Sequence, residues 1–485
     1  MCRPVGSAVA IASAVILVAA CGGGGGGPTG PSGPPVVTLI NGATLPSAPI
    51  GATVVIQGSN FGTGQAAASG QVLFTNGSGG PDTALIASAG DWTNTLIVTT
   101  VPAGAATGNV VVKTSGGTST ALVFTVAAKV AFNPSTVSWT STTALPIGLS
   151  GHAVAAATLP GATQTSVVYV VGGADSTNAP RDTVWYATVS SSGAVGAWTN
   201  TKVLPTSLAF TAAVVATPAN SPVTGSSYLY VLGGDSTASG KPVATVYVGT
   251  LTATGAVTSW NTTTALPGAV HSCGAVIFNG NVYVAGGSGS GNGAVATVYR
   301  AAIQSNGTLG AWQTLTALPF ARSYFGFGVN GTFLYAFGGD SGTVTPNDSS
   351  LRGSVISDVV YAQIDVHTGN LTAAGWTANG NKLKKAVGKH TAVVAGGSAL
   401  ITAGLYTGAT TGSTEETYAG LNPDGTTSAF NGATGVNTIA AAGGGNPFNH
   451  AATGYLDATG AFHVLVVGGD DVNTPTKKHK GVFYY

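Results

Sequence analysis

Four of the seven histidines lie at comparable points of a recurring pattern and are the first candidates for a polar site. His152, His271, His390 and His450 each stand just before an apolar segment of strand-like composition. A metal centre would require three or four imidazoles at about 2.0–2.1 Å from one ion. Spacing along the chain does not establish that convergence. We therefore assign no metal ion or other cofactor, and we expect histidines that hydrogen-bond the fold or contact a ligand.

Charged residues recur at a second point of the same pattern. Asp235, Asp340 and Asp470 each follow a pair of glycines, and Arg322 ends the segment Leu318–Arg322. A guanidinium group can hold a carboxylate or sulfate as a fork of donors, or it can hydrogen-bond the ends of strands. Together with the four histidines, these four residues are our candidate ligand-binding residues, and no residue is assigned a catalytic role.

Cys273 stands two residues after His271 and is the one cysteine beyond the N-terminal segment. A nucleophilic cysteine needs surroundings that lower its pKa, whereas a buried cysteine packs as a small apolar residue. We favour the structural interpretation. Cys2 and Cys21 lie in the N-terminal segment, so no disulfide is expected within the processed chain.

The composition restricts the classes of function. The 485 residues include 16 Lys or Arg and 15 Asp or Glu, so that 6% are charged, against about 25% in an average soluble domain. Nucleic acid is excluded as the main partner, because phosphate binding needs clustered cations. The 74 glycines disfavour helices and suit β structure that is rich in turns.

The N-terminus predicts export. Arg3 precedes an apolar run that ends at Cys21, which is the pattern of a secretion signal and is too short to span a bilayer. Val18–Cys21 resembles the bacterial lipobox. This resemblance implies lipidation of Cys21 and anchoring in a membrane, with residues 1–21 as the signal and residues 22–34 as a Gly/Pro-rich tether. Gly22 after the cysteine implies the outer membrane or the cell surface. The alternative is a simple signal followed by an unmodified cysteine.

Residues 35–128 predict a small β-sandwich. Short apolar runs alternate with segments rich in Gly, Pro, Asn, Ser and Thr, which is a strand and turn pattern. The runs are Val54–Ile56, Val72–Phe74, Leu96–Val98, Val110–Val112 and Leu122–Phe124. The segments Gly51–Gly62, Val101–Gly108 and Phe124–Val126 resemble the immunoglobulin-like IPT/TIG family. This resemblance implies a spacer or interaction module.

Residues 129–485 contain six repeats. An aromatic residue recurs at Trp139, Trp198, Trp260, Trp312, Trp376 and Phe430. A glycine pair closes an apolar segment at Gly172–Gly173, Gly233–Gly234, Gly286–Gly287, Gly338–Gly339 and Gly468–Gly469, with Ala403–Gly404 in the fifth unit. A tyrosine follows at Tyr186, Tyr247, Tyr299, Tyr361, Tyr418 and Tyr484. The markers keep the same order in every unit, which argues against chance recurrence.

This pattern resembles the kelch repeat of β-propellers. The resemblance implies an all-β fold, with an immunoglobulin-like β-sandwich followed by a six-bladed kelch-type β-propeller over residues 129–485. In such a blade, strand b ends in the glycine pair, strand c carries the tyrosine and strand d carries the tryptophan. The repeats begin at a strand d near Trp139 and reach a strand c at Val482–Tyr485. The N-terminal strand is therefore expected to complete the last blade and protect its edge.

Sorting the charges by connection singles out one face. In a four-stranded meander the d–a and b–c connections share one end, and ten of the 13 acidic residues after Lys129 lie between a glycine pair and the next tyrosine. The first, second and fourth units lean acidic. A cationic sector is predicted from Lys382, Lys384, Lys385, Lys389, Lys477, Lys478 and Lys480. Such a divided face suits an anionic glycan, and the alternative is a cluster of solvated loops.

Three functions fit these observations. We favour an exported, lipid-anchored envelope protein that binds a protein or glycan partner through the d–a/b–c face. The second hypothesis is a carbohydrate-active enzyme, because kelch propellers joined to immunoglobulin-like domains resemble galactose oxidase, and six-bladed kelch proteins include sialic acid mutarotases. The oxidase chemistry requires a Cys–Tyr cross-link and copper, but the chain has no adjacent His–His pair. Glu415 and Glu416, the only glutamates, lie in the most degenerate unit and are given no catalytic role. The third hypothesis is a structural envelope component.

Overall fold

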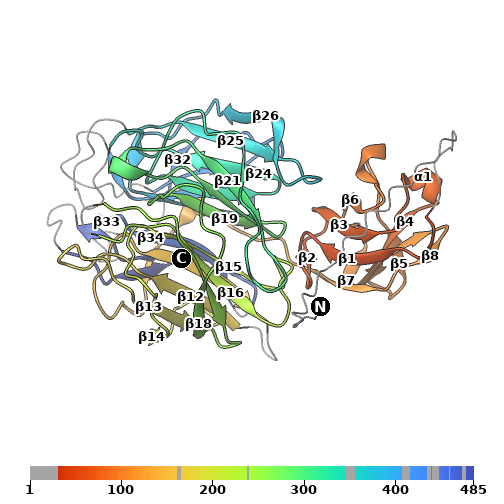
Figure 1. The fold of residues 1–485 in the computed structure, drawn as a ribbon, viewed down its shortest axis with the longest axis horizontal. Helices are drawn as coiled ribbons and strands as arrows, with labels where there is room; N and C mark the ends of the chain where they lie inside the picture. The colour runs from red at the N-terminus through yellow and green to blue at the C-terminus, as the bar shows by residue number, and fades with distance from the viewer. Residues whose placement is uncertain are drawn as a thin grey trace, which may run out of the picture.

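The computed structural model describes residues 31–160, 165–237, 240–343, 355–406, 416–433, 439, 447–457, 459–471 and 477–485. Over these ranges the protein is all-β, as expected, and its helical segments are one α-helix, α1 (Gln65–Ala68), and three 3₁₀ turns. Figure 1 shows two parts, with strands β1–β9 gathered at one end of the molecule and the later strands forming the larger part. Cys21, the signal and most of the tether lie outside the described residues.

The smaller part consists of two sheets. One has the strand order β1 (Val36–Ile40), β3 (Thr53–Ser59) and β6 (Leu96–Thr100). The other has the order β2 (Ser47–Ala48), β9 (Leu122–Val126), β7 (Ala105–Thr114), β4 (Gln71–Asn76) and β5 (Pro81–Thr83), with β8 (Gly117–Thr118) paired to β7. Each of the five apolar runs predicted here lies within a strand.

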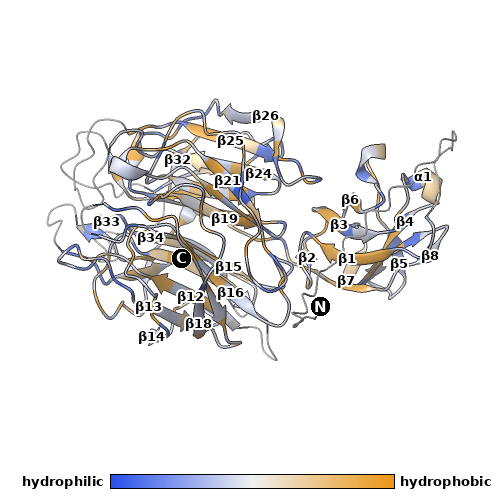
Figure 2. Cartoon of the chain, viewed as in Figure 1, coloured by the Kyte–Doolittle hydropathy of each residue, from blue (hydrophilic) through white to orange (hydrophobic). Residues whose placement is uncertain are grey.

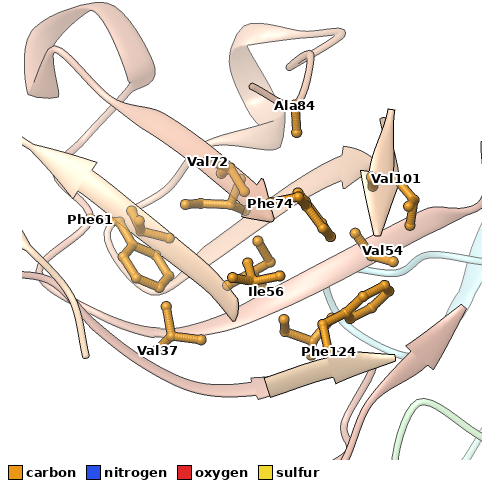
Figure 3. Packing of buried hydrophobic residues seen from close by; sticks show 14 of the residues in the cluster. Val37, Val54, Ile56, Phe61, Val72, Phe74, Ala84, Val101 and Phe124 are labelled. Atoms are coloured by element: carbon orange, nitrogen blue, oxygen red, sulfur yellow. The ribbon is translucent and has the colours of Figure 1, made fainter. Parts of the chain in front are cut away.

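The two sheets of the smaller part pack face to face. Successive side chains of a strand point to opposite faces, so Val54 and Ile56 of β3 reach the same core as Phe74 of β4 and Phe124 of β9 (Figure 3). The rings of Phe74 and Phe124 meet edge to face at 5.3 Å. The strands that enclose this core, β1 and β7 among them, are strongly hydrophobic (Figure 2).

The larger part contains six sheets of four antiparallel strands in its described residues. Sheet 1 is β11 (Ala153–Leu159), β12 (Thr165–Val171), β13 (Val184–Thr188) and β14 (Thr199–Asn200). Sheet 2 is β15 (Ala212–Ala216), β16 (Ser227–Leu232), β17 (Val246–Leu251) and β18 (Val257–Thr262). Sheet 3 is β19 (Gly274–Phe278), β20 (Asn281–Ala285), β21 (Val298–Ala302) and β22 (Gln313–Thr314).

The remaining sheets follow the same plan. Sheet 4 is β23 (Gly326–Asn330), β24 (Phe333–Phe337), β25 (Val359–Ile364) and β26 (Leu371–Ala378), and sheet 5 is β28 (Thr391–Ala395), β29 (Ser398–Thr402), β31 (Thr417–Gly420) and β32 (Asn431–Gly432). Sheet 6 is β34 (Ala451–Leu456), β35 (Phe462–Val467), β37 (Val482–Tyr484) and β10 (Thr140–Ser141). Two short pairs accompany them: β27 (Val387–Gly388) with β30 (Leu405–Tyr406), and β33 (Pro447–Phe448) with β36 (Asp470–Asp471). We letter the four strands of each sheet a to d in this order.

Strand β10 joins the two ends of the larger part. It pairs with β37 through Thr140 opposite Tyr484 and Ser141 opposite Phe483. Sheet 6 therefore takes its fourth strand from the beginning of the larger part, whereas the other five sheets are each built from one continuous segment of the chain.

The a strands contact one another in a closed cycle. β11 lies against β15, β15 against β19, β19 against β23, β23 against β28, β28 against β34, and β34 against β11. Each a strand is hydrogen-bonded on one side only. The six free edges surround a cavity of about 350 Å³, where they are protected from pairing with other chains.

A ring of backbone hydrogen bonds closes one end of this cycle. Six residues, one before each a strand, have φ angles of 51–57°: Gly151, Phe210, Ser272, Tyr324, Lys389 and Asn449. The N–H of each donates to the carbonyl of the corresponding residue in the preceding sheet, at N···O distances of 2.5–3.2 Å, and Gly151 completes the circuit by donating to Asn449. We call these six residues the axial ring. They mark the d–a/b–c face.

The smaller part packs against the opposite end, the a–b/c–d face. The N–H of Leu45 donates to the carbonyl of Pro218 at 2.8 Å, and Oγ1 of Thr44 donates to the carbonyl of Val223 at 3.1 Å. Both acceptors lie in the a–b connection of sheet 2. This placement leaves the d–a/b–c face clear of the smaller part.

Candidate functional site

The structure brings all eight candidate ligand-binding residues to the d–a/b–c end of the sheets, where all are buried. The three aspartates begin b–c connections, the four histidines flank the axial ring, and Arg322 lies in the d–a connection into sheet 4. The exposed fraction is 4% or less for His152, His271, Arg322, His390, His450, Asp235, Asp340 and Asp470. These residues form an internal polar layer beneath the d–a/b–c face, out of reach of a macromolecule at the surface.

The three aspartates occupy equivalent positions in sheets 2, 4 and 6. Each pairs through its backbone with the residue that precedes the axial ring in the same sheet. Oδ1 of Asp235 accepts from the N–H of Lys241 at 2.5 Å, and Oδ1 of Asp340 accepts from the N–H of Gly342 at 2.7 Å. These carboxylates brace the first residues of the b–c connections. Their Oδ2 atoms are buried, and neither has a hydrogen-bond partner in the described part of the chain.

Asp470 forms a buried ion pair. Its Oδ1 accepts from Nζ of Lys478, and its Oδ2 accepts from Nδ2 of Asn449 at 2.8 Å. Removing either charged partner would leave the other charge buried without compensation. Lys478 therefore has a structural role, contrary to its predicted place in an exposed cationic sector.

The side chains of three histidines lie between neighbouring sheets. His152, His390 and His450 each follow an axial-ring residue directly. Nε2 of His390 accepts from the N–H of Gly326 at 3.2 Å, and Nε2 of His450 lies 2.9 Å from Oγ1 of Thr402. Burial lowers the pKa of His152 and His390 to about 3 and that of His450 to about 4. All three imidazoles are therefore neutral near pH 7.

His271 precedes the axial ring instead of following it. Its Nδ1 lies 3.0 Å from Oγ of Ser272 and its Nε2 lies 3.2 Å from Oδ1 of Asn292, and burial lowers its pKa. The imidazole packs against Phe210 and Tyr324, whose rings lie 5.7 Å apart. Because Phe210 and Tyr324 belong to sheets 2 and 4, which are not neighbours, their rings meet across the axis.

The axial ring also buries a lysine that the sequence analysis placed in the exposed cationic sector. Lys389 is 2% exposed, and its Nζ lies 5.2 Å from the ring centroid of Tyr324 and 5.7 Å from that of Phe448. Such cation–π contacts stabilise a desolvated ammonium group. Sequence reasoning missed Phe210 and Tyr324, although an alignment of the six units would have shown that they occupy the same position as Lys389.

A cavity of about 180 Å³ lies beneath the axial ring. It is lined by the ring and by the residue that follows each ring member, namely His152, Thr211, Cys273, Phe325, His390 and His450. Burial raises the pKa of the Cys273 thiol to about 12, and the nearby imidazole of His271 is engaged with Ser272 and Asn292. This geometry supports a structural role for Cys273. Within the described ranges, no three His, Cys, Asp or Glu side chains are arranged to hold a metal ion.

Arg322 hydrogen-bonds the ends of strands, so it takes the structural one of the two roles considered for it. Its Nη1 donates to the carbonyl of Gly338 at 3.0 Å and to that of Asp358 at 3.4 Å. Burial lowers the pKa of the guanidinium to about 10, so the group stays charged at pH 7. With no exposed surface, it is not reachable by an anion in solvent.

Glu416 is a buried hydrogen-bond acceptor. Its Oε1 accepts from Nε1 of Trp139 at 3.0 Å, and burial raises its pKa to about 7. The carboxyl links sheet 5 to the tryptophan that precedes β10. Glu415 lies outside the described residues.

The exposed charge of the d–a/b–c face is cationic in the described part of the chain. Seven lysines in its d–a and b–c connections are exposed: Lys202, Lys241, Lys382, Lys384, Lys385, Lys477 and Lys480. We call them the lysine rim. Three aspartates of the same face, Asp175, Asp182 and Asp358, are half-buried, and Asp358 forms an ion pair with Nζ of Lys382 at 2.7 Å. Asp235 and Asp340, which made the second and fourth units lean acidic, are buried. The expected division into acidic and basic sectors is therefore not seen among these residues.

No helix among the described residues has the length and apolar character needed to cross a membrane.

Comparison with known proteins adds no family assignment. No model of a known protein family matches the chain, and no curated protein matches it significantly.

Proposed function

We propose that the chain is a cell-envelope lipoprotein that binds an acidic protein or glycan partner through the d–a/b–c face of its larger part. In this proposal residues 1–21 are the signal, lipidated Cys21 is the anchor and residues 22–34 are the tether. The sequence pattern around Cys21 supports the anchor. Replacing Cys21 by Ala is expected to move the protein from the membrane fraction to the soluble fraction, and an unchanged distribution would contradict the lipid anchor.

The proposal includes an immunoglobulin-like IPT/TIG domain over residues 35–128 and a six-bladed kelch-type propeller over residues 129–485. Two packed sheets with their own core support the first assignment. Six four-stranded sheets, the closed cycle of a strands and the pairing of β10 with β37 support the second. The smaller domain then acts as a spacer that carries the propeller away from the membrane.

The lysine rim is the observation that carries the binding function. Seven exposed lysines occupy one face in a chain that is only 6% charged, and the smaller part packs on the opposite face. Val203 and Phe320, exposed at 49% and 55%, lie in d–a connections of the same face. A cationic surface with exposed apolar side chains attracts an acidic partner and then offers it apolar contact area.

Charge reversal on the lysine rim tests this proposal. Lys382, Lys384 and Lys385 changed together to Glu should weaken binding to an immobilised anionic polysaccharide by roughly tenfold or more, because each exposed contact contributes up to about 1 kcal/mol. Binding should also weaken as salt is raised. Lys113→Glu, an exposed lysine of the smaller part, is the matched control and should bind normally. Equal binding to a neutral dextran, or equal loss in the control, would contradict the proposed face.

No observation in the described residues favours catalysis. The cavity beneath the axial ring holds imidazoles that are neutral and wedged between sheets, and the thiol of Cys273 is protonated.

A further inference from the structure

A cleft lies between the two parts of the molecule, at the opposite end from the lysine rim. Its volume is about 250 Å³, and it is lined by β1 and β3 of the smaller part, by the a–b and c–d connections of sheet 3 and by the c–d connection of sheet 4. Sites for drug-sized ligands typically measure about 300–1,000 Å³. The cleft is therefore suited to one small molecule.

Arg300 on β21 brings a positive charge to this cleft. Its Nη1 donates to Oδ1 of Asn281 at 3.2 Å and its Nη2 donates to Oε1 of Gln313. Both acceptors are neutral amides. The ion pairs of the described residues do not include Arg300, and its Nε is buried without a hydrogen-bond partner among them. A guanidinium that has no carboxylate partner among the described residues favours an anion that can accept a charge-assisted hydrogen bond.

Two buried amide oxygens call for a donor as well. Oε1 of Gln57, on the wall formed by the smaller part, is buried without a partner in the described structure. The same is true of Oδ1 of Asn370, which follows the cleft residue Gly369. Buried acceptors of this kind are normally hydrogen-bonded. Hydroxyl groups on a ligand would supply the missing donors.

The acidic groups near the cleft are already engaged. Nδ1 of His367 lies 3.1 Å from Oδ1 of Asp365, and its Nε2 lies 3.8 Å from Oδ1 of Asp91 on the smaller part. These contacts direct both carboxylates toward the imidazole at the edge of the cleft. The guanidinium of Arg300 therefore remains the charge that a ligand would meet.

We propose that this cleft binds a small hydroxylated carboxylate, the chemistry of a sugar acid. The guanidinium of Arg300 holds the ligand carboxylate, and the side-chain amide of Gln57 hydrogen-bonds a ligand hydroxyl. Apolar walls from Leu39, Phe278 and Ile364 pack against its C–H groups. Because Gln57 and Arg300 belong to different parts of the molecule, the bound ligand also holds the two parts together. This site is independent of the lysine rim.

Isothermal titration of the purified full-length chain tests the site. The probes are D-glucuronate, D-galacturonate and D-gluconate, with D-glucose and D-galactose as neutral controls. At least one acid should bind in a one-to-one ratio, and its neutral counterpart should bind roughly tenfold or more weakly, since hydrogen bonds to charged groups are the stronger ones. Bound acid should also raise the melting temperature, because it binds only the folded state.

Two variants separate the charge from the hydroxyl contact. Arg300→Gln should abolish the preference for acids, and Gln57→Leu should weaken acid and neutral sugar alike, so the second variant remains informative if the first unfolds. Arg181→Gln, which removes a guanidinium from the opposite face, should bind as the wild type does. Failure of all three acids to bind, or unchanged acid binding in folded Arg300→Gln, would overturn the proposal and leave the lysine-rim proposal unaffected.

Discussion

Buried ionisable side chains set the pH response of this protein. His152, His390 and His450 lie between sheets as neutral imidazoles, because burial disfavours their protonated form. Glu416 is the opposite case, because burial raises its pKa to about 7 and its neutral form is the one that folding favours. The two kinds of group therefore change stability in opposite directions with pH.

We predict that the free energy of unfolding falls on acidification. Unfolded histidine has a pKa of about 6.5, whereas burial lowers the folded values to about 3, 3 and 4. Between those limits the unfolded state binds more protons, so the stability present above about pH 6.5 is lost as the pH falls. Each histidine contributes up to about 1.4 kcal/mol per pH unit. His271, whose pKa is also lowered by burial, acts in the same direction. Glu416 opposes one histidine between about pH 4.5 and 7, so the net slope corresponds to at least about two protons.

Urea denaturation at about pH 7.5, 6 and 5 measures this slope. The variant His450→Gln should lower the stability at pH 7.5 and flatten the dependence by roughly one proton. Lys113→Glu, at an exposed position, should leave the slope as it is. A free energy of unfolding that stays constant down to pH 5 would show that the imidazoles are not buried as described.

At the scale of the strands, a repeated hydrogen bond from the tryptophan indole explains why this residue keeps the same position in successive repeats. Nε1 of Trp198 donates to the carbonyl of Thr143 at 2.9 Å, and Nε1 of Trp260 donates to that of Lys202 at 2.9 Å. Trp312 and Trp376 repeat the contact. In each case the acceptor stands four residues after the preceding tryptophan, so one indole hydrogen bond joins each of sheets 1 to 4 to the sheet before it. Trp139, the tryptophan of sheet 6, donates to Glu416 instead. Phe430 of sheet 5 has no N–H to donate from its ring.

The glycine pairs are required where the backbones of neighbouring sheets approach closely. We therefore predict that two glycine substitutions, one at such a point and one in open space, differ in their effect on stability. Gly172 has a φ of 61°, and a Cβ there would lie 2.2 Å from the carbonyl oxygen of Leu208 in the next sheet. Gly331 has a similar φ of 55° but open space around it. Gly172→Ala should cost about 3 kcal/mol or more because the backbone must move, whereas Gly331→Ala should cost about 1–2 kcal/mol of backbone strain. Urea midpoints of both variants measure the difference, and equal losses would refute the close approach of the sheets.

For the whole molecule, stability depends on completing the cycle of sheets. β37 lies between β35 and β10, so it is the strand through which the beginning of the larger part is joined to its end. Without it, sheet 6 loses its third strand, and β10 loses the partner to which Thr140 and Ser141 pair.

Deleting the last ten residues should therefore destabilise the entire larger part. We expect a melting transition that is lower by at least 10 °C, on the order of several kcal/mol for a unit of this size, and not merely a frayed end. Gln57→Leu, a single change in the smaller part, serves as a folded comparison. A truncated protein that melts at the wild-type temperature would show that β10 and β37 do not close the cycle.

Local patterns in the sequence were sufficient for several features of this protein. Strand-forming runs such as Val54–Ile56 and Val110–Val112, the glycine pairs and the tryptophan spacing depend on side-chain alternation and turn chemistry, which act within a few residues. They predicted an all-β chain, the position of its strands and the end of the sheets at which its charged connections gather.

Tertiary structure alone decided which of those charges are accessible. Lys389 and Lys478 are buried while Lys382 and Lys385 are exposed, although all four had been grouped together by sequence. The difference arises because burial depends on partners from other sheets, such as Tyr324 for Lys389. The placement of Arg300 and Gln57 along one cleft has the same origin, since residues far apart in the chain come together only when the two parts pack.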